Sequence, residues 1–226
     1  MSYERTLNRV ETYFDKTATR TWERLTSDAP VSRIRETVRR GRDAMRTEIL
    51  SRLPEDLCGA RVLDAGCGAG QMTHELALRG ADVTAVDISP SLVEIAARRL
   101  PIDLQGRVSF TAGDMLDPTL GQYDYVVAMD SLIYYTRPVL AEALAGLGAR
   151  TRERIVFTVA PRTPLLMAMW HAGKMFPRSD RSPIMVPQAP DALARELARC
   201  TTASTLVPLK RTTSGFYISQ ALELVS

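Results

Sequence analysis

Apolar positions in the first fifty residues recur at helical spacing. Leu7, Val10 and Phe14 fall on one face of a helix. A second stripe with the same spacing comprises Ile34, Val38, Met45 and Ile49. Between the two stripes lies the turn TSDAP, where Pro30 prevents the helix from continuing. The pattern predicts a helical N-terminal extension over residues 1–52.

From Arg61 the pattern changes to short apolar runs that alternate with amphipathic segments. The runs expected to be strands are RVLDAG, ADVTAVD, RVSFTAGD, YDYVVAMD and RIVFTVA, followed by two closing strands near residues 203–209 and 215–222. The segments between them carry helix signals, such as Ser89 as a cap before Pro90. Apolar strands alternating with amphipathic helices are typical of a parallel sheet covered on both faces. Residues 53–226 are therefore predicted to form an α/β, Rossmann-like, doubly wound and mostly parallel sheet of seven strands.

One segment, residues 161–188, has neither the strand pattern nor a clean helical period. It includes PLLMAMWHAGKMFPRSDRSP, an apolar block that gives way to prolines and arginines. The block is shorter than the ~18 apolar residues of a membrane-spanning helix. Because the segment follows the fifth strand, we expect it on the carboxyl edge of the sheet, where open α/β folds bind ligands. It is therefore a candidate substrate-binding insertion.

Composition and charge exclude several classes of protein. A formal charge of +3 without a clustered basic stripe argues against a nucleic-acid partner. The three cysteines form no CxxC pair, which indicates neither a zinc site nor a set of disulfides. We expect them to be small buried residues. No run resembles a signal peptide, and the protein is expected in the cytoplasm.

A glycine-rich turn follows the first predicted strand. VLDAGCGAG places Asp64, Gly66 and Gly68 there, and glycines let a ligand approach the backbone closely. The spacing is GxGxG, whereas the dinucleotide fingerprint is GxGxxG. A pyrophosphate would use the helix N-terminus as an anion site. A carboxylate at Asp64 instead suits a cationic ligand.

Further aspartates end the next three predicted strands. Asp87 is placed to bind a ribose diol, Asp114 and Met115 to bind adenine, and Asp130 ends the fourth strand. Such an acidic rim fits a nucleoside cofactor with a positive sulfonium, which is S-adenosylmethionine. The alternative is that these aspartates only cap helices and turns. The predicted cofactor-binding residues are Asp64, Gly66, Gly68, Asp87, Ile88, Asp114, Met115, Met129 and Asp130, with Tyr13 and Thr17 from an N-terminal helix expected to fold over the site as a lid.

Residues 61–160 resemble the class I S-adenosylmethionine-dependent methyltransferases. The flanking motifs YFDKTATRTWERL, VRRGRDAMR, MDSLIYY and FTVAPRTPLLMAMWHAGKMFPRSDRSP are similar to those of the magnesium-protoporphyrin IX O-methyltransferases. The resemblance implies methyl transfer to one propionate of the magnesium porphyrin, early in the (bacterio)chlorophyll branch of tetrapyrrole synthesis. The family commonly has a histidine in DSLIHY, where this chain has Tyr134. A general base at that position is therefore in doubt, and Tyr134 is expected to orient the carboxylate.

The insertion suits a porphyrin, which is a flat apolar disc with two carboxylates on one edge. Methionine and tryptophan side chains adapt to such a surface, and guanidinium groups pair with carboxylates. The predicted substrate-binding residues are Trp22, Arg162, Met169, Trp170, His171, Arg178 and Arg181. His171 is a candidate axial ligand of the magnesium, with water as the alternative because magnesium prefers oxygen ligands. The block could otherwise be an amphipathic cap with its arginines in solvent.

Two other functions stay open. The chain could methylate another hydrophobic acceptor, such as a quinone or a polyketide phenol, although no base for a phenol stands out at the strand ends. It could also bind S-adenosylmethionine or a tetrapyrrole without turnover. The resemblance further implies contact with magnesium chelatase, which makes the substrate. The apolar insertion predicts loose, peripheral membrane association.

Overall fold

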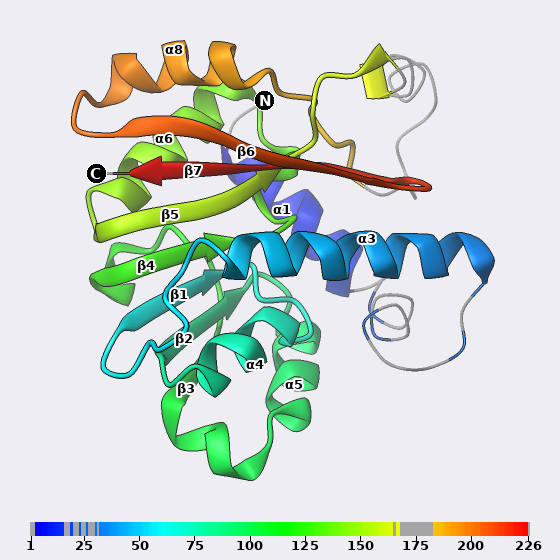
Figure 1. The fold of residues 1–226 in the computed structure, drawn as a ribbon, viewed down its shortest axis with the longest axis vertical. Coiled ribbons are helices and arrows are strands. Elements are labelled where there is room, and N and C mark those ends of the chain that lie inside the picture. Colours follow the sequence, from blue (N-terminus) through cyan, green and yellow to red (C-terminus); the bar gives the residue numbers. More distant parts are fainter. Residues whose placement is uncertain are drawn as a thin grey trace.

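The computed structural model describes residues 3–15, 19, 23, 26, 30, 32–164, 166–167 and 183–225. Figure 1 shows one sheet that crosses the molecule, with helices on both of its faces.

The sheet has seven strands in the order β3-β2-β1-β4-β5-β7-β6. They are β1 (Arg61–Ala65), β2 (Asp82–Asp87), β3 (Val108–Ala112), β4 (Tyr123–Ala128), β5 (Thr151–Val159), β6 (Thr205–Ser214) and β7 (Tyr217–Val225). Strands β1 to β5 pair in parallel, whereas β7 is antiparallel to both β5 and β6. The predicted doubly wound, mostly parallel seven-stranded sheet is confirmed. The two closing strands are longer than expected because they form an extended hairpin with each other.

Most of the helices pack into two large hydrophobic core clusters, whereas α5 contributes Leu92 and Ile95 to a third, smaller one. They are α1 (Tyr3–Tyr13), α3 (Arg33–Leu50), α4 (Gln71–Leu78), α5 (Pro90–Arg99), α6 (Arg137–Gly148) and α8 (Pro190–Cys200), with short 3-10 turns η2 (Ile102–Arg107), η3 (Pro118–Leu120) and η4 (Leu132–Tyr134). Side chains of α3 and α4 pack on one face of the sheet. Those of α6 and α8 pack on the other face. Figure 1 shows α3 lying across the sheet on the same side as α4.

Only the second half of α3 belongs to the core. Met45 and Ile49 are fully buried, as their stripe predicts. Ile34, at the other end of the same stripe, is 56% exposed. An 18-residue helix is about 27 Å long, and the first turns of α3 extend past the sheet (Figure 1). Helical spacing shows which residues share a face but not how far the covered surface reaches.

The cysteines are only partly as expected. Cys67 is buried beside the glycine turn, but Cys58 and Cys200 are exposed, so the prediction of burial is wrong for these two. Cys58 lies in the turn before β1 and Cys200 is the last residue of α8, and both positions are at the surface. Within the described residues, no cluster of three or more histidine, cysteine or acidic side chains could hold a metal ion. The helices of the described segments also include none with the length and apolar character to cross a membrane.

Candidate active site

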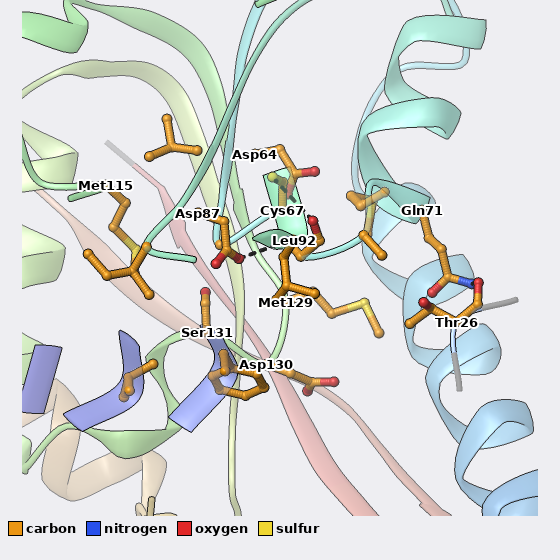
Figure 2. A pocket seen from close by; sticks show the side chains of 18 of the residues that line it. Thr26, Asp64, Cys67, Gln71, Asp87, Leu92, Met115, Met129, Asp130 and Ser131 are labelled. Carbon is orange, nitrogen blue, oxygen red and sulfur yellow. Dashed lines mark hydrogen bonds between the residues drawn. The ribbon is translucent and has the colours of Figure 1, made fainter. Parts of the chain in front are cut away.

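A cavity lies at the carboxyl ends of β1, β2 and β4, and α1 and α3 form part of its wall (Figure 2). Its lining combines carboxylates, two arginines and an apolar majority. The lining residues are Leu7, Val10, Phe14, Thr26, Arg42, Arg46, Asp64, Gly66, Cys67, Gly68, Ala69, Gln71, Met72, Val86, Asp87, Ile88, Leu92, Gly113, Met115, Met129, Asp130, Ser131, Tyr134 and Tyr135. The structure thus brings together most of the predicted cofactor residues from β1, β2 and β4.

The glycine turn is tightly packed against the loop after β4. Gly66 has a φ of 87°, a left-handed conformation that side chains disfavour. A Cβ at Gly66 would lie 2.2 Å from the Cβ of Ser131. The hydroxyl of Ser131 donates to the carbonyl of Ala65 at 2.6 Å, which fixes this contact. The turn can therefore present bare backbone to a ligand, as expected from the sequence.

Asp87 organises the same turn from the end of β2. Its Oδ2 accepts from the backbone N–H of Gly68 at 2.8 Å, and its Oδ1 accepts from that of Ser89 at 2.9 Å. Ser89 caps α5 and is followed by Pro90, as the sequence predicts. Burial raises the pKa of the Asp87 carboxyl, while these N–H donors oppose the rise. Asp87 projects into the cavity in Figure 2.

Asp64 lies at the base of the cavity and is almost inaccessible, with 1% of its surface exposed. Its Oδ2 accepts from the Thr73 hydroxyl at 2.6 Å. Burial raises the pKa of Asp64 to about 7, and the neighbouring charge of Asp87 adds to the effect, while the Thr73 hydrogen bond opposes it. The ionised form of this carboxyl is thus costly near neutral pH. A positive charge in the cavity would favour the ionised form of Asp64.

Asp130 is held by three other elements of the fold. Its Oδ2 pairs with Nη1 of Arg42 on α3, and its Oδ1 accepts from the hydroxyls of Thr158 on β5 and Tyr217 on β7, at 3.2 and 3.1 Å. Its backbone N–H donates to Thr158 at 2.7 Å. Among the described residues, Asp130 is the only non-glycine with positive φ, at 59°. Such conformations persist where the surroundings fix them, often at functional sites.

Sequence reasoning missed the two arginines of the cavity, Arg42 and Arg46. Both occur in the motif VRRGRDAMR, one helical turn apart on α3. Arg46 pairs with Asp43 at 2.7 Å, and Arg42 pairs with Asp130. Their i, i+4 spacing puts both on one helix face. That spacing was the available signal, but nothing local shows that this face meets the end of β4.

The first helix lies over the cavity. Leu7, Val10 and Phe14, the stripe seen in the sequence, all line it. Tyr3 stacks on Tyr135, with ring centroids 5.1 Å apart, and its hydroxyl donates to Asp114. Tyr13 ends the helix and is not among the lining residues.

Asp114 is placed differently from the other three aspartates. It does not line the cavity, whereas its neighbour Met115 does. Besides the Tyr3 hydroxyl, its Oδ1 accepts from the backbone N–H of Leu116 at 2.8 Å. An adenine amine at Asp114 would therefore compete with Tyr3.

Tyr134 lines the cavity at the end of η4, and its ring meets that of Phe14 edge-on at 6.3 Å. Burial raises the pKa of the Tyr134 hydroxyl, and the nearby Asp130 charge raises it further. Burial also raises the pKa of Tyr135 to about 12. Both phenols are therefore hydrogen-bond donors at neutral pH and poor bases.

The insertion after β5 is anchored beside the cavity at both of its described ends. The N–H of Arg162 donates to the carbonyl of Gln188 at 2.9 Å, and the N–H of Gln188 to that of Ala160 at 2.8 Å. The N–H of Val186 donates to the carbonyl of Ile133 in η4. The side chain of Arg162 is exposed and does not line the cavity. The predicted site residues Thr17, Trp22, Met169, Trp170, His171, Arg178 and Arg181 lie outside the described residues.

The sheet order, the glycine turn and the buried carboxylates at successive strand ends define a class I S-adenosylmethionine-dependent methyltransferase fold. Residues 62–153 match a family described as a methyltransferase domain. Residues 128–226 match the family described as magnesium-protoporphyrin IX methyltransferase C-terminus. A magnesium-protoporphyrin O-methyltransferase from Rhodobacter capsulatus is 60% identical over 222 residues, which are 98% of this chain and 97% of the relative. The chain therefore belongs to the magnesium-protoporphyrin O-methyltransferase family.

Other similarities differ in how much of the chain they cover. The crystal structure of magnesium protoporphyrin IX methyltransferase from Synechocystis with bound SAH has a TM-score of 0.77 and 26% identity, covering 96% of this chain and 97% of that one. A ubiquinone biosynthesis O-methyltransferase from Xanthomonas oryzae is 31% identical, but over 52% of this chain and 50% of its own length. Thr158 and Tyr217 lie beyond the general methyltransferase match and within the porphyrin-specific one.

Proposed function

We propose that this protein transfers the methyl group of S-adenosylmethionine to a propionate carboxylate of magnesium protoporphyrin IX, giving the monomethyl ester in (bacterio)chlorophyll synthesis. The observation that carries the proposal is the charge pattern of the cavity in a chain of this family. Buried carboxylates at β1 and β2 suit a sulfonium cofactor, and arginines of α3 at the end of β4 suit an acidic acceptor. The cradle at Gly66, which a Cβ would fill, fits a cofactor that lies against the backbone.

Asp87 would bind the ribose of the cofactor. Replacing it by alanine removes charge-assisted hydrogen bonds worth roughly 1.5–3 kcal/mol, so cofactor affinity should fall by about one to two decades. Calorimetric titration with S-adenosylhomocysteine measures the change.

Asp82, at the other end of β2, provides the control because its side chain is 62% exposed. Asp82→Ala should leave the dissociation constant unchanged. An unchanged constant for Asp87→Ala, in protein shown to be folded by circular dichroism, would disprove the assignment.

The chemistry needs little help from a general base. A propionic acid has a pKa near that of glutamate, about 4.3, so the nucleophile is already an anion at pH 7. The bound cofactor supplies an electrophilic methyl group on a sulfonium. In the proposed transfer, the carboxylate oxygen would form a bond to the methyl carbon while the carbon–sulfur bond breaks, and the electron pair of the broken bond would stay on sulfur. The protein must align these atoms and exclude water, and alignment alone can remove much of the barrier.

Tyr134 would orient the carboxylate as a hydrogen-bond donor. Tyr134→Phe should lower kcat by tenfold or less, near the ~1 kcal/mol of one neutral hydrogen bond. The kcat profile between about pH 6.5 and 9 should keep its shape, since a phenol with a raised pKa is not a base there. A loss of about a thousandfold, or a basic limb that disappears in the variant, would show that proton abstraction matters.

The remaining parts of the substrate site are proposals of the same kind. Residues 1–52 would act partly as a lid, since α1 covers the cavity. Residues 161–188 would contact the porphyrin, since their described ends are fixed beside η4. We also propose contact with magnesium chelatase, because that enzyme makes the substrate. We propose peripheral association with membranes as well, because the porphyrin is poorly soluble in water.

A panel of acceptors tests the proposed function. Magnesium protoporphyrin IX should be methylated, whereas its dimethyl ester, which has no free carboxylate, should bind without turnover. Metal-free protoporphyrin IX and a catecholic quinol complete the panel. Preferred turnover of the quinol would replace the proposal with the ubiquinone-type function, and cofactor binding without any product would support a binding protein.

A further inference from the structure

The cavity poses an electrostatic problem for an acidic acceptor. Three aspartates line it, and each repels a carboxylate. Arg42 and Arg46 are the arginines in the lining. Since β2, β1 and β4 are neighbours spaced about 4.8 Å apart, the end of β4, which Asp130 follows, is about 10 Å along the sheet from the end of β2, where Asp87 lies. The arginine that Asp130 holds is therefore on the side of the cavity away from the proposed ribose site.

The elements around Asp130 also lie on this side of the cavity, away from the proposed ribose site, which we call the acceptor side. Thr158 is on β5 and Tyr217 on β7, which follow β4 in the sheet order. η4 begins two residues after Asp130 and is tied to the end of the insertion by the hydrogen bond from the Val186 N–H to the carbonyl of Ile133. Because both carboxylate oxygens of Asp130 are engaged by protein groups, this aspartate is occupied with holding its neighbours.

The approach of α3 to β7 depends on Gly41. A Cβ there would lie 2.6 Å from Cδ1 of Tyr217 and 3.0 Å from the Cβ of Ser214. The Ser214 hydroxyl donates to the carbonyl of Thr37, which fixes the hairpin against the helix. This close packing brings the next residue, Arg42, to Asp130.

We infer that Tyr217 is a positioning residue, which through Asp130 holds Arg42 where its charge admits the propionate of the acceptor. The inference rests on the proposed porphyrin acceptor. The Tyr217 hydroxyl donates to both oxygens of Asp130, at 3.1 and 3.3 Å. Burial and the Asp130 charge raise the pKa of this phenol, so it remains a donor across the working range of pH. Tyr217 contributes to recognition of the acceptor's negative charge and not to recognition of the porphyrin's shape.

Two ligands that share the porphyrin ring but differ in the charge of their propionate groups test the inference. Magnesium protoporphyrin IX and its dimethyl ester are each titrated by porphyrin fluorescence into enzyme saturated with S-adenosylhomocysteine. In Tyr217→Phe, which keeps the ring against Gly41, the dicarboxylate should bind about fivefold to tenfold more weakly. Binding of the ester and of S-adenosylhomocysteine should be unchanged. Arg42→Gln should weaken binding of the dicarboxylate more than Tyr217→Phe does. Arg42→Lys should retain part of the affinity that Arg42→Gln loses.

Tyr123→Phe is the matched control. Tyr123 is a buried tyrosine of β4 whose hydroxyl donates to the carbonyl of Leu120 at 2.6 Å, and it does not line the cavity. Loss of the Tyr123 hydroxyl should alter the stability of the protein but not the ratio of its affinities for the dicarboxylate and the ester. Equal weakening of both porphyrins, unchanged binding of both, or weaker binding of S-adenosylhomocysteine in Tyr217→Phe would each overturn the inference. Wild-type enzyme that binds both porphyrins but forms no ester would refute the proposed function and leave this comparison intact.

Discussion

Replacing Asp64 by asparagine is expected to stabilise the protein at pH 8 while weakening its affinity for S-adenosylmethionine. The buried carboxyl has a pKa of about 7 in the folded protein and about 3.9 in an unfolded chain. Between these values the folded state binds more protons than the unfolded state, so stability falls as pH rises from about 4 to 7. At 1.36 kcal/mol per unit, three units correspond to about 4 kcal/mol as an upper limit. Asparagine keeps the acceptor for Thr73 and removes the charge.

The difference between variant and wild type isolates Asp64 from other titrating groups. Denaturant unfolding from pH 5 to 8.5 should show a gain in the free energy of unfolding that grows with pH and levels off above pH 7. Asp103→Asn, at an exposed position in η2, should show no such trend. Calorimetry at pH 8 should show weaker binding of S-adenosylmethionine, with a smaller effect on the uncharged sulfide product. A variant no more stable at pH 8 than at pH 5, relative to wild type, would contradict this account of Asp64.

Glu223→Gln is expected to lower the free energy of unfolding by about 3 kcal/mol, the lower end of the range for breaking a buried ion pair. Glu223 is 2% exposed and accepts from Arg52 at 2.6 Å and Arg154 at 2.7 Å. Glutamine would leave two cations facing each other without a counter-charge. The loss stays at the lower end because both arginine side chains reach solvent, at 38% and 32% exposed.

Chemical denaturation at pH 7.5 measures this loss. Glu153→Gln, an exposed position on the neighbouring strand β5, should change stability by less than about 0.5 kcal/mol. A loss below 1 kcal/mol for Glu223→Gln would mean that the ion pairs of Glu223 with Arg52 and Arg154 contribute little to holding the segment after α3 against β5 and β7.

The sheet and the glycine turn could be predicted because their signals are local. Asp64, Gly66 and Asp87 follow apolar runs at the spacing of parallel strands, and parallel strands bring their ends to one edge. The same reasoning placed Asp114 in the site, but Tyr3 engages its carboxylate from more than a hundred residues away. A partner so distant in the chain leaves no local pattern.

The arginine side of the cavity could not be predicted for the same reason. Arg42, Asp130, Thr158 and Tyr217 come from α3, the loop after β4, β5 and β7, and no two of them share a motif. The reason for a glycine at position 41 is equally non-local, because a Cβ there would meet Tyr217 and Ser214 of the C-terminal hairpin. The exposed Ile34 is a further case, because the end of the sheet beneath α3 is set by tertiary packing.

The proposed reaction is tested most directly by transfer of a labelled methyl group. The purified protein is incubated with S-adenosylmethionine carrying a trideuteromethyl group and with magnesium protoporphyrin IX, and the porphyrin is analysed by mass spectrometry before and after mild alkaline hydrolysis. We expect one trideuteromethyl group per porphyrin, which is lost on hydrolysis with recovery of the starting dicarboxylate. A label that survives hydrolysis, or a porphyrin that gains no label while the cofactor binds, would contradict methylation of a propionate.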